Sequence, residues 1–356
     1  MSGPRSSERL HDRIERAAAV AGADDDRALR RALLEEVRTA VDFDAFAWLL
    51  TDPVTTVGSS PLAEAPCLSE LPRLIRLKYL TSVTRWTVPG RPPVLSLVGA
   101  TRGRLAASMV WRELLADYDV VDVASLVFAD RFGCWGFLDL WRQAPAPPFS
   151  AAELLDLASV VVPVTAALRR SQAGFLLQRG ATHEDPPGPV VMVLSEDLEV
   201  RAMTPETERV LRMLVPPSGG ASPVPAAAYN VGAQLLAAEA GDDPHPAMTR
   251  VHVRDDWWVA LRAARMVATG GQATTDIAVT IEQVTLDERV ELFVRAVGLS
   301  ARETELVHLL RSGTSTREAA ELMTLSRHTV GDHLKSVFAK AGCRSRGELL
   351  ARLAGR

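Results

Sequence analysis

Hydroxyl and basic side chains lie close together near the C-terminal end of the chain, in the run that begins at Ser326. Ser326 is placed to cap the start of a helix, where the first backbone amides have no partner within the helix. These amides, with the positive end of the helix dipole, can hold a phosphate group. From residue 299 onward the chain has ten Lys and Arg against six Asp and Glu, whereas the remainder has 30 against 38. This modest basic excess agrees with a nucleic acid as partner.

The elements that must position this run are four short helices over residues 299–356. Gly313 and Gly342 stand where helices should end, since glycine adopts the left-handed conformation of a C-terminal cap at little cost. The break at 323–325 is about as short as the turn of a helix-turn-helix, whose second helix enters the major groove of DNA. Three S-x-x-E capping boxes mark helix starts, and they pair Ser300 with Glu303, Ser315 with Glu318 and Ser345 with Glu348.

The whole segment resembles the LuxR/FixJ-type helix-turn-helix of bacterial transcription factors. Several elements match at fixed spacing, so the signal is more specific than a single short motif. The resemblance implies double-stranded DNA as the partner, and a homodimer, because one small helix-turn-helix covers only half a site. The matching pieces are Ser300-x-Arg302-Glu303, Gly313-x-Ser315-x-x-Glu318-x-Ala320, Leu325-Ser326-x-x-Thr329-Val330-x-x-His333 and Lys340-x-Gly342-x-x-Ser345-Arg346.

The resemblance also implies roles for individual residues of the third helix. Phosphate contacts position a protein, and contacts to base edges specify the sequence. Lys335 is the best candidate for either contact. The residues expected near phosphates are Ser326, Arg327 and Thr329, and those expected to face the groove are Val330, Gly331, Asp332 and Lys335.

Several of these assignments have an alternative. Val330 is apolar, and packing into the helical core is the favoured role for it. His333 can contact a base or hold the backbone, and Lys340, Arg344 and Arg346 can flank the groove or be solvated charges.

Gly331 and Asp332 depart from the family pattern. A basic residue is common at the position of Gly331, and glycine weakens a helix by about 1 kcal/mol relative to alanine. Asp332 can accept a hydrogen bond from cytosine or repel a phosphate. Both residues bear on the target sequence and on the affinity for DNA.

Composition favours a soluble, cytoplasmic protein. The three cysteines, Cys67, Cys134 and Cys343, form no C-x-x-C pair, which favours reduced thiols over a disulfide framework or a zinc site. The N-terminal segment is polar, unlike a signal peptide. The longest apolar run, 157–168, contains a proline and is too short to span a bilayer. No phosphate-binding loop of the G-x-x-x-x-G-K type occurs, and we expect no cofactor.

The expected fold is multi-domain: two α+β domains, GAF-like and then PAS-like, followed by an all-α four-helix helix-turn-helix domain. Residues 1–23 are expected to be a polar tail running into a leading helix. The GAF-like domain covers 24–172 and resembles its type in topology and composition, without a signature motif. Its expected elements are a helix at 26–41, a strand at 43–50, a loop at 53–72, a helix at 71–79, a hairpin of 124–130 with 134–141, and a long helix from Ser150 to about Gln178.

A linker is expected at 173–187, then the PAS-like domain at 188–284 and a helical connector at 285–298 that leads to the C-terminal domain at 299–356. No internal sequence repeat is evident. The expected elements of the second domain are strands at 190–194 and 198–203, a helix at 206–214 with Thr204 as its N-cap, a loop at 216–225, a helix at 226–240, a hairpin of 249–254 with 257–264, and a strand at 276–282.

Large aromatic residues in the GAF-like domain suggest a cavity lined by rings. The candidates for binding a ligand are Trp48, Trp86, Trp111 and Phe128. Ordinary core packing is the alternative, since large aromatics dominate cores in any case.

No metal site is expected, because the spacing of His245 and His252 beside Asp242 and Asp243 fits no ligand pattern.

These features favour a sequence-specific DNA-binding transcriptional regulator. In this interpretation an effector binds the N-terminal half differently in two states and so changes how the two helix-turn-helix domains are presented. A protein that keeps the fold but binds a partner protein instead of DNA stays open because of Gly331 and Asp332. An enzyme in the N-terminal half is disfavoured, because no nucleophile elbow, paired-carboxylate motif or metal triad occurs.

Overall fold

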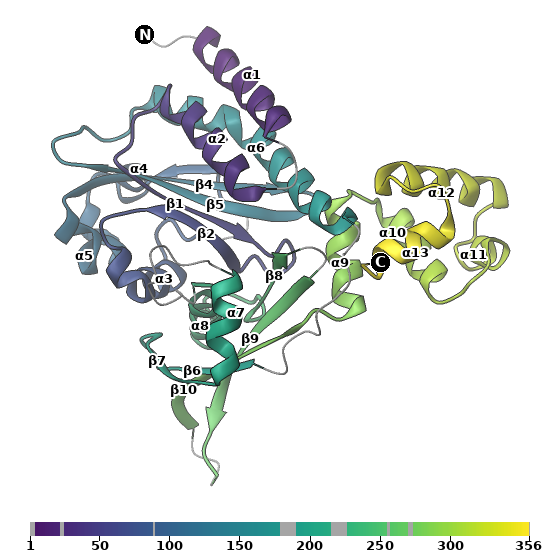
Figure 1. Cartoon of the computed structure of the whole chain (residues 1–356). Coiled ribbons are helices and arrows are strands. Elements are labelled where there is room, and N and C mark those ends of the chain that lie inside the picture. Colours follow the sequence, from purple (N-terminus) through teal and green to yellow (C-terminus); the bar gives the residue numbers. More distant parts are fainter. Residues whose placement is uncertain are drawn as a thin grey trace.

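The computed structural model describes residues 4–21, 25–87, 90–178, 190–214, 226–254, 257–269 and 273–355. Two α+β domains and a small helical domain follow one another along the chain (Figure 1). We call 4–178 the first domain, 190–283 the second domain and 301–353 the C-terminal domain; helix α9 (Leu286–Ala296) joins the last two. The predicted order of two α+β domains and one all-α domain is confirmed.

A five-stranded antiparallel sheet forms the centre of the first domain, in the order β2-β1-β5-β4-β3. Its three middle strands are almost entirely buried, because helices cover both faces. Successive residues of a strand point to opposite faces, so Phe46 and Trp48 enter one core while Ala45 enters another. The strands are β1 (Ala45–Thr51), β2 (Gly58–Glu64), β3 (Val94–Ser96), β4 (Val120–Asp130) and β5 (Gly133–Gln143).

Helices α1, α2 and α6 cover the face that carries Trp48, and α3 to α5 cover the face that carries Trp141 (Figure 1). Short 3-10 turns lie at 68–70, 105–107 and 115–118. The helices are α1 (Pro4–Val20), α2 (Asp26–Arg38), α3 (Leu71–Leu80), α4 (Leu97–Thr101), α5 (Met109–Glu113) and α6 (Ala151–Leu177).

Helix α6 begins as predicted, with a reciprocal capping box between Ser150 and Glu153, and Pro163 lies inside it. It is long and apolar enough to be a candidate membrane span by length and composition, and half of that apolar stretch is buried inside the protein.

The first domain differs from the expected elements in three places. Residues 53–72 are not all loop, because β2 lies within them; Pro61 is compatible with a strand at the edge of the sheet. Helix α1 is part of the domain core, since Leu10 and Ile14 are buried against it. The predicted linker 173–187 begins inside α6, and residues 179–187 lie outside the described chain.

The second domain has a sheet in the order β7-β6-β10-β9-β8, which is the same local order as in the first domain. The two domains thus share a sheet topology, although no internal sequence repeat indicates this. The predicted loop at 216–225 and the turn at 255–256 lie outside the described residues. The elements are β6 (Val190–Leu194), β7 (Val200–Met203), β8 (Met248–Arg254), β9 (Trp257–Val267), β10 (Ala273–Gln283), α7 (Pro205–Leu214) and α8 (Ala226–Glu239).

Helix α8 lies between the two domains and is buried along most of its length. It packs against the second sheet on one side and against α3 and β2 of the first domain on the other. Val57 and Ile75 of the first domain therefore share one apolar cluster with Val231 of α8. The approach is close at Gly58, where a Cβ atom would lie 2.7 Å from a Leu49 methyl carbon and 2.8 Å from the Asn230 Oδ1 atom.

The C-terminal domain has the four predicted helices: α10 (Ala301–Arg311), α11 (Thr316–Leu322), α12 (Arg327–Ala341) and α13 (Arg346–Leu353). Two of the predicted capping boxes, at Ser300 and Ser315, have both hydrogen bonds: the serine hydroxyl accepts from the amide of the glutamate, and the glutamate side chain accepts from the serine amide. The third differs from the reciprocal pattern. The Ser345 hydroxyl accepts from the Glu348 amide, and the Glu348 side chain accepts from the Arg344 amide, one residue before the cap.

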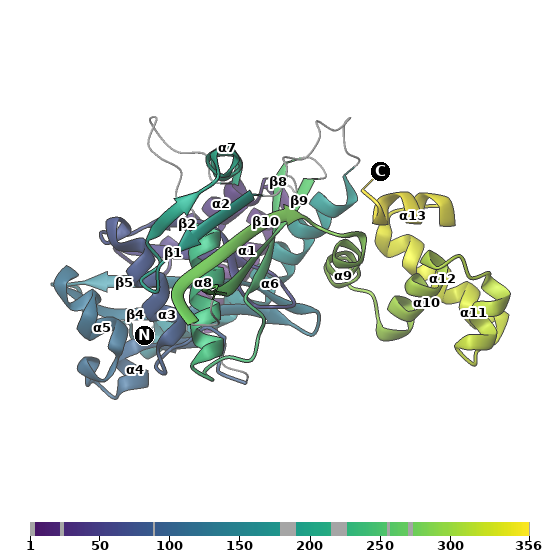
Figure 2. The same cartoon turned by 90° about the horizontal axis from the view of Figure 1, so that it is seen from below.

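The C-terminal domain projects to one side of the two sheets and is attached through α9 (Figures 1 and 2). Phe293 of α9 is fully buried in a cluster that continues from the first domain into the C-terminal domain. At the junction, Gly298 has φ +71°, and a Cβ atom there would lie 2.5 Å from the Arg169 guanidinium of α6. The Arg295 guanidinium of α9 donates to the Phe132 carbonyl of the β4–β5 turn at 2.8 Å.

Candidate nucleic-acid interface

The start of α12 is built as an exposed helix cap. The Ser326 hydroxyl accepts a hydrogen bond from the Thr329 amide at 3.1 Å, as the sequence predicts. Thr324, with φ +57°, makes the turn between α11 and α12, and the amide of Leu325 bonds back to the Ala320 carbonyl. The remaining free amides at the start of α12 are therefore available to an anion at the exposed end of the domain.

One face of α12 is open to solvent over its whole first half. The side chains of His328 and Lys335 are 88% and 79% exposed. A Cβ atom added at Gly331 would meet nothing within 4 Å, so a ligand can approach the backbone there. Arg327 and Asp332 are exposed, and Thr329 and His333 are half-buried. This face has the exposure that a helix needs to enter a groove of DNA.

Asp332 lies in the middle of this face and is paired with its basic neighbours. Its carboxylate is 3.1 Å from the Lys335 ammonium and 3.5 Å from the His328 ring. The hydrogen bond from Lys335, followed by the charge of His328, lowers the pKa of Asp332. Asp332 therefore stays ionised and offsets part of the positive charge that the face would present to a phosphate.

Four other residues predicted to bind DNA lie outside the exposed face of α12. Val330 is fully buried, so the core alternative holds for its side chain, and the groove-facing assignment is wrong. Lys340 is held by Glu303 of α10 at 2.6 Å. Arg346 donates to the carbonyls of Leu310 and Thr314, so it joins α13 to α10. Arg344 is exposed, and its contact with DNA stays a prediction.

Glu303 connects α10 to α12 from a buried position. It accepts hydrogen bonds from the Ser300 amide, the Ser336 hydroxyl and the Lys340 ammonium, each at 2.6 Å. Burial alone would raise the pKa of Glu303, but these hydrogen bonds outweigh it and hold the pKa at about 2. The carboxylate therefore holds α12 against α10.

His328 is an exposed residue of this face that the sequence pattern did not single out. Its position between Arg327 and Thr329 was a usable signal, because neighbours on either side were assigned to the phosphate backbone. The structure places its ring on the exposed face, beside Asp332.

The four aromatic ligand candidates of the first domain do not share one cavity. Trp48 and Phe128 contact each other at 5.5 Å between ring centroids in the core under α6. Trp86 stacks on Phe137 on the opposite face of the sheet, and its indole donates to Asp139. Trp111 lies in a third cluster. The cavity predicted from these four residues is therefore not formed, and core packing is their role.

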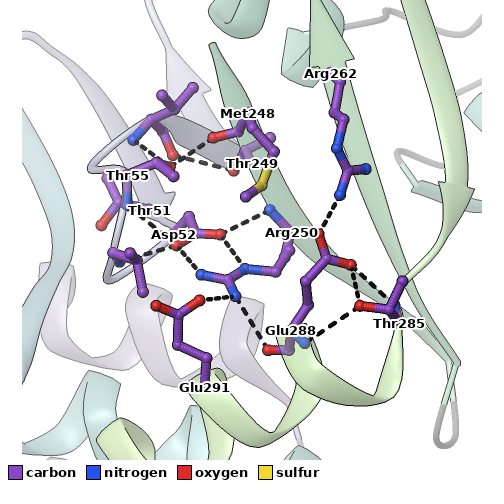
Figure 3. A network of polar contacts seen from close by, with 12 residues as sticks. Thr51, Asp52, Thr55, Met248, Thr249, Arg250, Arg262, Thr285, Glu288 and Glu291 are labelled. Atoms are coloured by element: carbon purple, nitrogen blue, oxygen red, sulfur yellow. Dashed lines mark hydrogen bonds and ion pairs between the residues drawn. The ribbon is translucent and has the colours of Figure 1, made fainter. Parts of the chain in front are cut away.

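A polar network that sequence analysis did not predict joins both α+β domains to α9 (Figure 3). Asp52 follows β1 and Arg250 lies in β8; both side chains are fully buried. The Arg250 guanidinium bonds to both Asp52 carboxylate oxygens, at 2.6 and 2.8 Å, and also to Glu291 and the Glu288 carbonyl of α9. Nothing in a local pattern could have indicated this, because the two partners are 198 positions apart.

Two further hydrogen bonds strengthen the contact between the domains around this pair. Thr55 donates to the Met248 carbonyl at 2.5 Å and Thr249 donates to the Val57 carbonyl at 3.1 Å. Arg262 of β9 forms an ion pair with Glu288 of α9 (Figure 3). The contact between the two α+β domains is therefore bonded directly to α9, the helix that precedes the C-terminal domain.

Residues 297–353 match the family model described as "Bacterial regulatory proteins, luxR family". The C-terminal domain is a LuxR-type helix-turn-helix domain. No curated protein sequence matches the chain.

Among solved structures, SdiA in complex with octanoyl-rac-glycerol is 10% identical over 100% of this chain and 97% of that chain, with a TM-score of 0.35. The VqmA dimer of Vibrio cholerae is 17% identical over 48% of this chain and 83% of that chain, with a TM-score of 0.20. VqmA bound to DPO is 18% identical over 47% and 85%, with a TM-score of 0.19. These TM-scores are too low to establish a shared overall fold, so the assignment depends on the family model and the geometry of α12.

Proposed function

We propose that the protein is a cytoplasmic, homodimeric transcriptional regulator that binds specific DNA sites through α12. Its first and second domains act as GAF-like and PAS-like sensor domains for an effector. The observation that carries this proposal is the exposed face of α12 in a LuxR-type domain, with a free helix start, Lys335 and an open backbone at Gly331. The network between Asp52, Arg250 and Glu291 supplies the route from the sensor domains to that face.

The test is selection of binding sites from genomic DNA by the full-length protein. An enriched two-fold symmetric site is expected for a dimer with one helix-turn-helix per half-site. Absence of any enriched site at low salt, for both the full chain and residues 286–356, would contradict DNA binding.

Replacing Lys335 with alanine is expected to weaken binding to the selected site roughly tenfold, and to reduce the slope of log K against log salt by about 1 per subunit. Lys335 is the most exposed lysine of the α12 face and one of its few cations. Fluorescence anisotropy at several salt concentrations measures both quantities. Arg302→Ala is the matched control, because Arg302 also forms an exposed i,i+3 ion pair but lies on α10. An equal loss in both variants would assign the effect to net charge and not to the face of α12.

Replacing Asp332 with asparagine is expected to strengthen DNA binding severalfold and to make the salt slope steeper by up to about 1 per subunit. The change removes a negative charge from the face and releases Lys335, which lies 3.1 Å away. The same anisotropy titrations measure it.

Asp332 also favours a second candidate function, because it offsets part of the positive charge that the α12 face would present to DNA. This function is a protein-interaction module that retains the LuxR-type fold. In that case the Asp332→Asn variant would gain no affinity for DNA at any salt concentration, and wild-type protein would show no salt-dependent retention on DNA.

A further inference from the structure

A small cavity lies where the first and second domains meet beside α6. Its volume is about 40 Å³, and its walls come from both domains. Phe175 of α6 stacks on His252 of β8 with 4.3 Å between ring centroids, and His252 contacts Trp258 of β9 at 5.2 Å. Trp135 of β5 closes the side that belongs to the first domain. Flat rings from two domains therefore enclose the cavity.

Trp258 has an unused hydrogen-bond donor at this cavity. The residue is buried, and its indole Nε1 atom has no hydrogen-bond partner in the described structure. Buried polar groups in folded proteins are nearly always paired, so an exception calls for an explanation. The indoles of Trp48, Trp141 and Trp257 are also without a partner among the described residues, but none of these residues lines the cavity. Of the two tryptophans that line it, Trp135 donates to Asp130 at 3.0 Å, so Trp258 is the one whose donor is unused.

The carboxylate and guanidinium groups that line the cavity are already paired. Asp26 is paired with Arg30, and Arg250 is held by Asp52 and Glu291. A charged ligand would therefore be buried without a counter-ion, which is strongly unfavourable. Ser60 and Gln172 add neutral polar groups to the lining. The chemistry of the walls selects an uncharged ligand.

We propose that this cavity binds a small uncharged molecule with a flat apolar ring and one hydrogen-bond acceptor. The ring lies among Phe175, His252 and Trp258, and the acceptor takes the indole N–H of Trp258. This inference rests on the proposed function in one respect, that the bound molecule is the effector.

Binding is linked to the DNA-binding domain through the walls of the cavity. A volume of about 40 Å³ holds only a few atoms, because one water molecule needs about 10–15 Å³. A ring must therefore move the walls apart, and these belong to different domains. Arg250 lines the cavity and also bonds to Glu291 of α9, so this movement changes the position of the helix that leads into the C-terminal domain.

The experiment measures ligand binding directly, on full-length protein without DNA, so its failure is separate from a failure of DNA binding. The probes are acetophenone, which has the ring and a carbonyl acceptor, ethylbenzene, which lacks the acceptor, and benzoate, which is charged. Saturation-transfer NMR titrations give the affinities. Acetophenone is expected to bind at least about tenfold more tightly than either of the other two, the difference that one good hydrogen bond makes.

Two variants locate the probe. Trp258→Phe removes the N–H and also shortens the ring system, which enlarges the cavity for both probes. The ratio of acetophenone affinity to ethylbenzene affinity should therefore fall about tenfold. Leu168→Ala enlarges the cavity from the α6 side and should strengthen acetophenone binding severalfold. Three results would each overturn the proposal: no saturation transfer to wild-type or Leu168→Ala protein, the same ratio of acetophenone to ethylbenzene affinity in wild-type and Trp258→Phe protein, or preferred binding of benzoate.

Discussion

Replacing Asp52 with alanine is expected to lower the free energy of unfolding by about 3–5 kcal/mol, because it leaves the Arg250 guanidinium buried without its main partner. Both side chains are fully buried, and Asp52 accepts three hydrogen bonds from Arg250, one of them from its backbone amide at 3.0 Å. Asp52 also accepts from the amide of Val54 at 2.9 Å, which shapes the turn after β1. The loss therefore combines an uncompensated charge with a weakened loop. Urea unfolding followed by tryptophan fluorescence measures it.

The matched comparisons are a double variant and a more exposed ion pair. Asp52→Leu combined with Arg250→Met is expected to recover most of the stability, because an apolar pair of similar size is often as stable as a buried ion pair. Arg262→Ala breaks a partly exposed pair with Glu288 and should cost less than about 1 kcal/mol. A loss from Asp52→Ala no larger than that from Arg262→Ala would contradict the role given to the buried pair.

The double variant should also separate stability from the response of DNA binding to an effector. The double variant restores packing between the domains but removes the bond from Arg250 to Glu291 of α9. We therefore expect it to fold and bind DNA while losing the response of DNA binding to an effector.

Replacing Glu303 with glutamine is expected to destabilise the C-terminal domain by about 2–3 kcal/mol, because three hydrogen bonds to a buried carboxylate are weakened together. One of the three comes from the Lys340 ammonium of α12, which would keep its charge without a partner. Hydrogen exchange of the α10 and α12 amides in the full-length protein measures the loss. Glu318→Gln is the matched control, since Glu318 closes an equivalent capping box on α11 but is solvent-exposed and has no lysine partner. A similar loss in both variants would reduce the role of Glu303 to that of an ordinary cap.

The pH dependence of this domain follows from the same carboxylate. The pKa of Glu303 is about 2 in the folded protein, below its ordinary value near 4.3 in an unfolded chain. A lowered pKa contributes stability that is complete above the unfolded value and is lost as the pH falls towards the folded value. We therefore expect the C-terminal domain to lose stability between about pH 4.5 and pH 2, and the Glu303→Gln variant to lose less over that range. An equally steep loss in the variant would assign acid sensitivity to other groups.

The sequence by itself determined the local features of this protein. The strands β4 and β5 and the helix starts depend on residues a few positions apart; these starts are at Ser150, Ser300, Ser315 and Ser326. The resemblance of 299–356 to a LuxR-type domain depends on several such short pieces at fixed spacing. Capping, alternation and turn formation are interactions between near neighbours, so a short window of sequence contains their cause.

The tertiary structure decided the features that depend on contacts between distant residues. It placed β2 at a sheet edge, buried Ile14 of α1, and separated Trp48, Trp86 and Trp111 into different clusters. It also paired Lys340 with Glu303 of α10, and Arg346 with the carbonyls of Leu310 and Thr314. The pairing of Asp52 with Arg250 and the wall formed by Phe175, His252 and Trp258 unite residues from separate domains. No local period encodes such pairs, because their energy comes from burial and charge complementarity that exist only once the domains have packed together.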